Sequence, residues 1–593
     1  MPDFLAIFDV PGDRIRGRVD TLDEPQAGRD LAWNRWPWGW LGVNPKLWRR
    51  VQGDGLVTYI CGRPARRAHG GDVERSIAGA LDGSASAYHA ISGMFLVLQA
   101  TRTNLALVTD RFAHRPAYAT ARQPHQDCFA ISSNVEWIID ALRTAPAFDD
   151  VSLAELLLWN NATYPYTTRD GIHQLAPGSL HEVTLDQEGA ASIGTTTLWQ
   201  PREPNRWPGK RACIEACAAG VGEAAREITA NASRIGVLLS GGLDSRIIAA
   251  TLSQHAEVET FTYCDRPNPE TDSAARTASV LGLPHHLVRR DPQFYAHAFV
   301  EGQRVLGYEQ NSLPCHALCV ADHPAIAGLD VVVSGFGCDI LLKGAYVPYS
   351  MVNVLLQHHR LRRLPYQERI GKHNYSHVLK RKSIVCPELV AAAFERRDAY
   401  ERSLREIRPD TAEEWMGFYP ISHTTSIDST LISRYFPHDE FFFRAGLVEA
   451  SMATPWAWKK GLDLISRLAL RVAPTVARLP HPDTGYPATM TYLPSRVVCK
   501  VRPRKPVAPV GGPGASTEPW FSQGSFINYA KFLAQAPAWR VIRDEAMGRS
   551  EAISVLQRIL TVDPADTFGT YAEQYDSLLN ATVVQILRMA GRA

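Results

Sequence analysis

Short apolar or alternating runs separated by turn residues dominate the first 200 residues of this 593-residue chain. Runs of this length between Gly, Asp, Asn and Ser clusters are typical of β-strands. One helical pattern begins at Val151, with Ser152 as its expected N-terminal cap. Residues 1–200 are therefore predicted to form a strand-rich α+β domain. The clearest strand patterns cover residues 4–10, 56–62, 93–100, 104–112, 128–134 and 179–185.

The pattern changes after residues 197–211, a Pro-, Trp- and Arg-rich segment that fits neither period and is predicted to be a linker. Strand-like and helix-like runs alternate from there, which predicts a doubly wound parallel sheet. A second domain is expected over residues 201–593, mostly helical beyond residue 350, with an exposed or disordered loop at 501–519. Expected strands cover 234–240, 258–265 and 330–335; expected helices cover 212–232 and 270–282, and another starts at 243.

The stretch VLLSGGLDSRIIAA, residues 237–250, interrupts an apolar strand with a small polar turn before a helical pattern resumes. Unpartnered N–H groups at a helix N-terminus bind anions, and glycines allow an oxyanion to approach closely. Asp244 would repel a phosphate unless Mg²⁺ lies between them. The turn therefore predicts a site for metal-bound pyrophosphate, formed by Leu239, Ser240, Gly241, Gly242, Leu243, Asp244 and Ser245.

A second strand-to-turn pattern occurs in VVVSGFGCDILLKG, residues 331–344. Either turn alone could be an ordinary strand-to-helix connection with a capping residue. Two such turns, each with an acid, could instead hold one Mg²⁺-pyrophosphate from both sides. Asp244 and Asp339 are thus the predicted metal-linked acids, and the predicted nucleotide contacts of the second turn are Ser334, Gly335, Phe336 and Gly337.

The Ser-Gly-Gly-Leu-Asp-Ser turn resembles the pyrophosphate loop of the N-type ATP pyrophosphatases, and most of the chain resembles the asparagine synthetase superfamily. The resemblance implies an α+β, Ntn-type, glutaminase-like sandwich over 1–200. It also implies an α/β doubly wound ATP pyrophosphatase (synthetase) domain over 201–593, with ATP and Mg²⁺ as cofactors. The segments that carry the resemblance are 93–120, 128–140, 172–183 and 433–455, the last with Arg434, Asp439 and Glu440.

The N-terminal domain departs from the family at the residue that would carry its chemistry. Class II glutamine amidotransferases use an N-terminal cysteine as nucleophile, whereas this sequence starts Met1-Pro2-Asp3 and its first cysteine is Cys61. The glutaminase-like domain is therefore expected to be inactive, with a structural or docking role.

Two further departures concern the synthetase domain. Phe336 stands where the resemblance implies Glu in asparagine synthetases or Tyr in β-lactam synthetases, and a phenyl ring cannot transfer a proton. Residues 476–490 contain no lysine where the family has one near the pyrophosphate. Lys459, Lys460 and His481 are the candidates for stabilising phosphate charge, although the two lysines could equally be a solvated pair at a helix start.

Without channelled ammonia, an amine on the substrate itself is the simplest nucleophile. The resemblance then favours the lasso peptide cyclase branch, in which an Asp or Glu side chain of a leader-free precursor peptide is adenylated and the peptide's N-terminal amine closes a macrolactam. The implied partners are the precursor peptide, a leader peptidase and a leader-recognition protein. A β-lactam synthetase-like or asparagine synthetase-like amide ligase, or a non-catalytic scaffold, are the alternatives.

Composition narrows the class of protein further. The net charge is +2, with 45% hydrophobic and 21% charged residues, which gives no reason to expect nucleic acid or a membrane surface as partner. Ten cysteines in 593 residues are too dilute for a disulfide scaffold, and the i,i+4 pairs Cys213/Cys217 and Cys315/Cys319 fit helix faces better than zinc. With no signal peptide and no integral membrane segment expected, the predicted location is cytoplasmic.

Overall fold

The structure is a computed structural model, and it describes most of the chain. The ranges described are 3–8, 31–53, 55–67, 72–121, 129–142, 145–186, 191–291, 293–346, 376–421, 427–459, 462–482, 485–489, 529–568 and 577–591.

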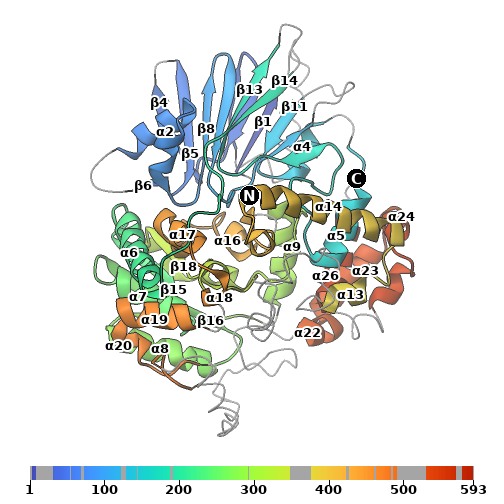
Figure 1. Cartoon of the computed structure of the whole chain (residues 1–593). Helices are drawn as coiled ribbons and strands as arrows, with labels where there is room; N and C mark the ends of the chain where they lie inside the picture. Colours follow the sequence, from blue (N-terminus) through green and yellow to red (C-terminus); the bar gives the residue numbers. More distant parts are fainter. Residues whose placement is uncertain are drawn as a thin grey trace.

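Two six-stranded antiparallel sheets form the N-terminal part of the chain, seen at the top of Figure 1. The first has the order β12-β10-β11-β1-β3-β2 and the second the order β14-β13-β9-β8-β5-β4. The strands are β1 (Phe4–Phe8), β2 (Ala32–Trp36), β3 (Gly39–Val43), β4 (Trp48–Gly53), β5 (Leu56–Gly62), β8 (Phe95–Thr101), β9 (Asn104–Thr109), β10 (Tyr118–Thr120), β11 (Phe129–Ser132), β12 (Ile172–Gln174), β13 (Ser179–Leu185) and β14 (Ala191–Thr197). All six strand patterns expected from the sequence correspond to strands here.

Strand β1 shows how the sandwich is held together. Its alternate residues Phe4, Ala6 and Phe8 lie in the apolar core shared by both sheets. Leu5 and Ile7 face the other way and pack with helix α4 (Val135–Ala141). Because both faces of the strand are covered, its sequence is apolar throughout rather than alternating. Helices α2 (Val73–Leu81) and α3 (Ala85–His89) and the short pair β6 (Ala65–Arg66) and β7 (Ile91–Ser92) complete this part.

A five-stranded sheet, parallel at every pairing, lies in the second part of the chain and is consistent with the predicted doubly wound sheet. From β15 the chain adds two strands on one side and then returns to add two on the other. Such a reversal leaves a crevice beyond the carboxyl ends of the strands, where open α/β sheets bind ligands. The order is β17 (His285–Arg289), β16 (Glu257–Cys264), β15 (Arg234–Leu238), β18 (Val331–Ser334), β19 (His438–Glu440).

Helices connect and cover these strands, and the described part of the chain beyond residue 350 is mostly helical, as expected (Figure 1). The predicted loop 501–519 lies outside the described residues. The helices are α6 (Lys210–Thr229), α7 (Leu243–Leu252), α8 (Pro269–Leu281), α9 (Phe294–Leu306), α10 (Cys338–Leu341), α13 (Ser376–Arg381), α14 (Pro387–Ile407), α15 (Ala412–Trp415), α16 (Ile427–Ile432), α17 (Ala445–Met452), α18 (Trp456–Lys459), α19 (Asp463–Val472), α20 (Pro474–Ala477), α22 (Tyr529–Gln535), α23 (Pro537–Met547), α24 (Ser550–Ile559) and α26 (Ser577–Ala590).

Helix α5 (Asp150–Trp159) leaves the sandwich and packs among α13, α14, α24 and α26. Its residues from Ser152 to Trp159 are all buried, so it is covered on every side. The expected cap was wrong: the helix starts one residue earlier than its sequence pattern, and Asp149 accepts the N–H of Val151. The Ser152 hydroxyl instead donates to Asp149 at 2.8 Å.

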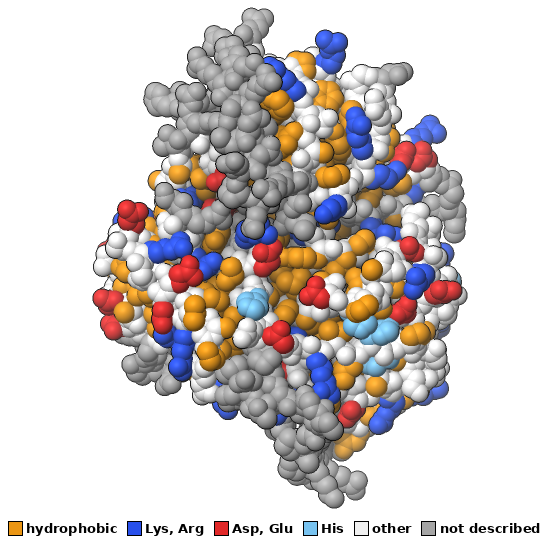
Figure 2. Space-filling view, turned by 180° about the vertical axis from the view of Figure 1, so that it is seen from behind, with side chains coloured by type: hydrophobic (Ala, Val, Ile, Leu, Met, Phe, Trp, Pro, Cys, Tyr) orange, Lys and Arg blue, Asp and Glu red, His pale blue; other side chains and the backbone are white. Residues whose placement is uncertain are grey.

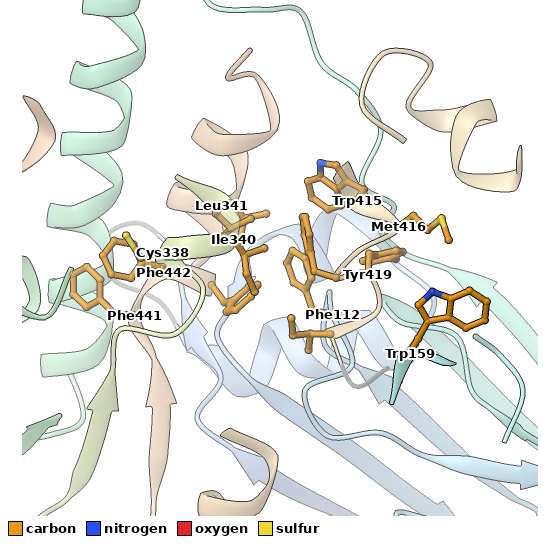
Figure 3. Close-up of a cluster of buried hydrophobic side chains, with 14 of the residues drawn as sticks. Phe112, Trp159, Cys338, Ile340, Leu341, Trp415, Met416, Tyr419, Phe441 and Phe442 are labelled. Carbon is orange, nitrogen blue, oxygen red and sulfur yellow. The ribbon is translucent and has the colours of Figure 1, made fainter. Parts of the chain in front are cut away.

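Buried contacts join the two parts of the chain. Asp3, directly before β1, is fully buried and forms ion pairs with Arg434 at 3.1 Å and Arg115 at 3.5 Å. Figure 3 shows Phe112 of the N-terminal part among Trp415 and Tyr419 of the C-terminal part, with ring centroids 6.0 and 5.9 Å apart. The two parts of the chain therefore meet in a packed interface.

The surface seen in Figure 2 mixes positive and negative side chains, with hydrophobic ones between them. On the described part of that face there is no continuous field of one charge. Among the described residues, no helix is both long and apolar enough to cross a membrane.

Candidate functional site

The loop after β15 is shaped by glycine and by a buried arginine. Gly241 has φ +75°, and a Cβ there would lie 2.8 Å from the Ser273 side chain, so only glycine fits. Gly242 is the N-cap of α7, and no side chain in the described ranges caps that helix start. Arg246 donates to the Gly241 carbonyl at 2.8 Å and to the Pro480 carbonyl at 2.7 Å. The helix N–H groups are thus left for a ligand, on a loop that Arg246 fixes.

The loop after β18 follows the same plan. The Ser334 hydroxyl donates to Glu440 at 2.6 Å and accepts the N–H of Phe336 at 3.2 Å. Gly337 has φ +93°, and a Cβ there would lie 2.6 Å from the ring of Phe443. One side of this turn therefore packs against Phe443 in the core, and the other side faces the cavity described below.

The two predicted acids meet at one cation of the protein. Lys343 Nζ lies 3.2 Å from Asp244 and 2.8 Å from Asp339. Burial by itself lowers the pKa of this ammonium, but attraction to Asp244, Cys338 and Asp339 raises it above its ordinary value. Lys343 is accordingly charged at neutral pH, and it joins the two turns.

A cavity of about 520 Å³ opens at this edge of the sheet. Its lining includes Lys343 and, of the residues expected from the sequence, Leu239, Ser240, Gly242, Asp244, Ser245, Ser334, Gly335, Phe336, Asp339 and His481. Gly241, Leu243 and Gly337 are not among the lining residues and support the two turns from behind.

The edge strand β19 supplies a further wall of the cavity that the sequence did not reveal. His438 and Glu440 both line it and are buried, at 3% and 1% exposure. Between them along the strand, Asp439 forms an ion pair with Arg444, which also lies 3.4 Å from Glu227. Arg434 binds Asp3 at the domain junction. Of the three residues named in that segment, Arg434, Asp439 and Glu440, only Glu440 borders the cavity.

The lysine candidate that the structure describes, Lys459, is not in the lining of the cavity. Lys459 is 1% exposed, and its ammonium lies 2.9 Å from Glu414, inside the protein core. A buried lysine needs such a partner, and Glu414, 45 positions earlier, could not be associated with it from the sequence. Lys460 lies outside the described residues. Among the described residues, Lys343 is the lysine in the lining of the cavity.

The residues present fit a Mg²⁺ ion bound together with phosphate. Within the described ranges, no group of three or more His, Cys, Asp or Glu side chains could hold a metal alone. Mg²⁺ however takes one or two protein carboxylates and completes its shell with phosphate oxygens and water. Asp244 and Asp339 reach the same ammonium, so they are also within reach of one metal cation.

The sandwich offers a thiol close to Asp3, but an unreactive one. Cys61 is fully buried, and burial raises the pKa of its thiol to about 12, despite the nearby charges of Arg115 and Arg434. A neutral thiol is a poor nucleophile. The geometry near β1 therefore gives no support to cysteine-based glutamine hydrolysis.

Two family models match the chain. Residues 219–461 match asparagine synthase, and residues 71–194 match the glutamine amidotransferase domain. Together they support a relationship to the asparagine synthetase superfamily and, through the first match, ATP-dependent amide formation.

Other similarities are more limited. The tRNA-specific 2-thiouridylase MnmA of Trichlorobacter lovleyi is 41% identical over 69 residues, 10% of this chain, and the chain covers 20% of that enzyme's length. Among solved structures, the allosteric regulatory enzyme of purine biosynthesis is 9% identical, covering 48% of this chain and 74% of its own. Glutamine phosphoribosylpyrophosphate amidotransferase from B. subtilis is 11% identical, covering 55% and 91%. Both have a TM-score of 0.19, too low to carry an argument.

Proposed function

We propose that this chain is an ATP-dependent macrolactam synthetase of the lasso peptide cyclase type. It would adenylate an Asp or Glu side chain of a leader-free precursor peptide and join it to the peptide's own N-terminal amine. The observation that carries the proposal is the convergence of Asp244, Asp339 and Lys343 at one cavity on the carboxyl edge of the parallel sheet.

In the first step, an oxygen of the substrate carboxylate attacks the α-phosphorus of ATP, and pyrophosphate leaves with the electron pair of the broken P–O bond. The N–H groups at the start of α7 and the Lys343 ammonium would neutralise the departing charge. Asp244 and Asp339 are the residues that would hold Mg²⁺, which supplies further charge neutralisation when bound.

In the second step, the amine attacks the acyl carbon, a C–N bond forms, and the C–O bond to AMP breaks. One proton must leave the nitrogen. Glu440 borders the same cavity and accepts a hydrogen bond from Ser334 at 2.6 Å, but its side chain is fully buried, so it could accept this proton only after its carboxylate moves toward the substrate. Phe336, also in the lining, has no group that could do this.

The state of the sandwich favours an amine carried by the substrate over channelled ammonia. Cys61 is neutral, and Asp3 is locked between two arginines. An intramolecular amine also has an energetic advantage, since correct positioning of two reacting groups can supply about 7–11 kcal/mol of the barrier. On this proposal, a leader peptidase and a leader-recognition protein would deliver the peptide.

The test uses the full chain with Mg²⁺, ATP and a series of synthetic linear peptides, each with a free α-amine and one Asp or Glu. The expected result is peptide-dependent ATP–pyrophosphate exchange and ATP-dependent loss of one water from a peptide, read by mass spectrometry. An N-acetylated copy of the same peptide should still support exchange but lose no water. Absence of exchange with every peptide would favour a scaffold, and amidation by added ammonia without ring closure would favour an asparagine synthetase-like ligase.

A further inference from the structure

We infer that Arg246 is a positioning residue for the pyrophosphate part of ATP. It acts from behind the turn that follows β15, where it fixes the orientation of the Gly241–Gly242 peptide and the place of the segment that carries His481. The inference rests on the proposed function, because it deepens the role assigned there to this turn.

The side chain of Arg246 joins three segments of the chain. Arg246 lies near the start of α7 and is buried, with 1% exposure. Its neighbours Asp244 and Ser245 border the cavity, whereas Arg246 does not. Its guanidinium donates to the carbonyls of Gly241 at 2.8 Å, Val476 at 3.0 Å, Leu479 at 2.9 Å and Pro480 at 2.7 Å, and to the Ser273 hydroxyl at 2.8 Å.

The buried charge of Arg246 has no carboxylate as a direct partner. Within the described ranges its hydrogen bonds go to carbonyls and to one hydroxyl. Burial lowers the pKa of Arg246 to about 10, although attraction to Asp244 acts in the other direction, so the guanidinium is charged at pH 7. Burial of such a charge is unfavourable. A neutral side chain would therefore be better tolerated here unless the hydrogen bonds of the guanidinium served the site.

The hydrogen bond to the Gly241 carbonyl determines which way one peptide of the turn faces. Gly241 and Gly242 are joined by a trans peptide, in which the C=O and the following N–H point in opposite directions. Because Arg246 holds the carbonyl behind the turn, the N–H of Gly242 faces the Ser240 hydroxyl, at 3.4 Å. Ser240 and Gly242 border the cavity and Gly241 does not. The N–H is thus presented to a phosphate in the cavity.

Without Arg246, this peptide could turn over. Glycine on both sides removes the Cβ atoms that normally restrict the rotation of a peptide. A reversed peptide would direct the Gly241 oxygen at the phosphate and withdraw the N–H of Gly242, so an attraction would become a repulsion. The Ser273 hydroxyl supports the observed orientation, because it accepts from Arg246 and also donates to the Gly241 carbonyl at 3.4 Å.

The remaining hydrogen bonds of Arg246 hold the segment that brings His481 to the cavity. Three carbonyls of this segment accept from the guanidinium, and the last of them belongs to Pro480, directly before His481. His481 borders the cavity, and its own carbonyl closes a turn with the N–H of Gly485 at 2.8 Å. Arg246 therefore fixes two walls of the cavity relative to each other, the phosphate turn and the His481 segment.

The experiment measures the affinities of the full chain for magnesium pyrophosphate and for AMP by calorimetry. It compares the unmodified protein with Arg246→Met, which has no donor, and with Arg246→Lys, which keeps the charge but lacks the planar fork of donors. AMP lacks the two phosphates expected at the turn, so its affinity reports on the rest of the nucleotide site.

Arg408→Met is the matched control. Arg408 is also buried, at 1% exposure, and burial likewise lowers its pKa to about 10. Its guanidinium donates to the carbonyls of Pro201 and Met452, and it does not border the cavity. Its loss therefore imitates the removal of a buried arginine without touching the phosphate turn.

We expect Arg246→Met to weaken pyrophosphate binding by about tenfold to a hundredfold, the effect of losing a hydrogen bond to a charged group. The affinity for AMP should be nearly unchanged, Arg246→Lys should lie between the two, and Arg408→Met should alter neither affinity. Equal losses of both affinities in the Arg246 variants, or unaltered pyrophosphate binding, would overturn the inference. If neither Arg246 variant folds, Ser273→Ala replaces them: a selective loss of pyrophosphate affinity supports the inference, and no loss overturns it.

Failure of the proposed function is seen separately, because the binding measurement requires no peptide. An unmodified protein that binds magnesium pyrophosphate but closes no ring contradicts the proposed function alone. Ring closure by the unmodified protein, together with equal losses of both affinities in Arg246→Met, contradicts the role of Arg246 alone.

Discussion

Two aspartates near the first strand of each part of the chain have opposite surroundings. Asp3 precedes β1 of the sandwich and is fully buried between Arg115 and Arg434, with its own N–H bound to Ser133 at 3.1 Å. Asp244 follows β15 of the parallel sheet, retains 16% exposure of its side chain, and shares the ammonium of Lys343 with Asp339. The carboxylate of Asp3 is fully paired with groups of the protein. The carboxylate of Asp244 still has oxygens available to a ligand in the cavity.

This comparison shows why the same residue type has a structural role in one place and a ligand-binding role in the other. A buried carboxylate with two arginines has no capacity left for a ligand and stabilises the fold only while both partners remain. A carboxylate that borders a cavity and shares its ammonium partner with a second acid, as Asp244 does, can instead bind a metal ion that arrives with a nucleotide. Five predictions test the contrast.

The largest effect is expected from Asp244→Ala. Removing one of the two acids that would hold Mg²⁺ should reduce ATP–pyrophosphate exchange by about a thousandfold or more, which corresponds to about 4 kcal/mol of transition-state stabilisation. Thermal unfolding should be almost unchanged, because this carboxylate is not part of a closed cluster. Asp82→Asn, at an exposed helix end, is the matched control. Exchange at the unmodified rate in Asp244→Ala would refute the metal assignment.

Asp3→Asn should have the reverse effect: it should lower the stability of the protein but leave ATP–pyrophosphate exchange largely unchanged. It leaves two buried guanidinium groups without a counter-charge, which is expected to lower the free energy of unfolding by about 3–5 kcal/mol, measured by denaturant titration of the sandwich. Exchange by the protein that remains folded should persist. A loss of exchange in folded Asp3→Asn would mean that the junction controls the cavity.

The stabilising effect of Asp3 is also expected to depend on pH. Burial raises the pKa of Asp3, but Arg434 and Arg115 more than offset this and hold it below the ordinary value of 3.8. Because the folded-state pKa is depressed, the stabilisation is complete above pH 3.8 and is lost as the pH falls below it. The stability difference between the unmodified protein and Asp3→Asn should therefore shrink in that acidic window.

A smaller effect on exchange is expected for Lys343→Met. Loss of one charge that faces the departing pyrophosphate should slow exchange by about a hundredfold. Lys343→Arg keeps the charge next to Asp244 and Asp339 and should retain a larger part of the rate. Equal losses in the two variants would show that the lysine acts through packing rather than charge.

The smallest effect is expected for Cys61→Ala. Because the Cys61 thiol is neutral, the unmodified protein should release glutamate from glutamine only at the background rate, and the variant should do the same. Glutamate release above background in the unmodified protein would refute the assignment of the sandwich as catalytically inactive.

The sequence was informative where local chemistry determines local structure. The turns at Ser240 and Ser334 combine glycines, a strand before them and a helix after them, and their acids indeed lie at one cavity. The strands with long apolar runs were also predicted correctly, because strand periodicity is readable over six or seven residues. Whether those acids hold Mg²⁺ stays a prediction.

The remainder of the site depends on contacts between distant residues. Strand β19 has only three residues, too few to show a period, so the position of His438 could not be foreseen. Lys343 stands four residues after Asp339, a spacing visible in the sequence, but only the fold brings Asp244 to the same ammonium. Lys459 failed as a candidate for the same reason: its buried partner Glu414 is distant in sequence.

Helix α5 has a consequence for how the protein is made. Its apolar surface is covered by helices that include α26, and Ser577 follows Trp159 by about 400 residues. At a synthesis rate of about 5–20 residues per second, the ribosome needs about 20–80 s to cover that distance. Until α26 has been made, part of the apolar surface of α5 has no final neighbour, so the nascent chain carries an uncovered hydrophobic surface for much of its synthesis.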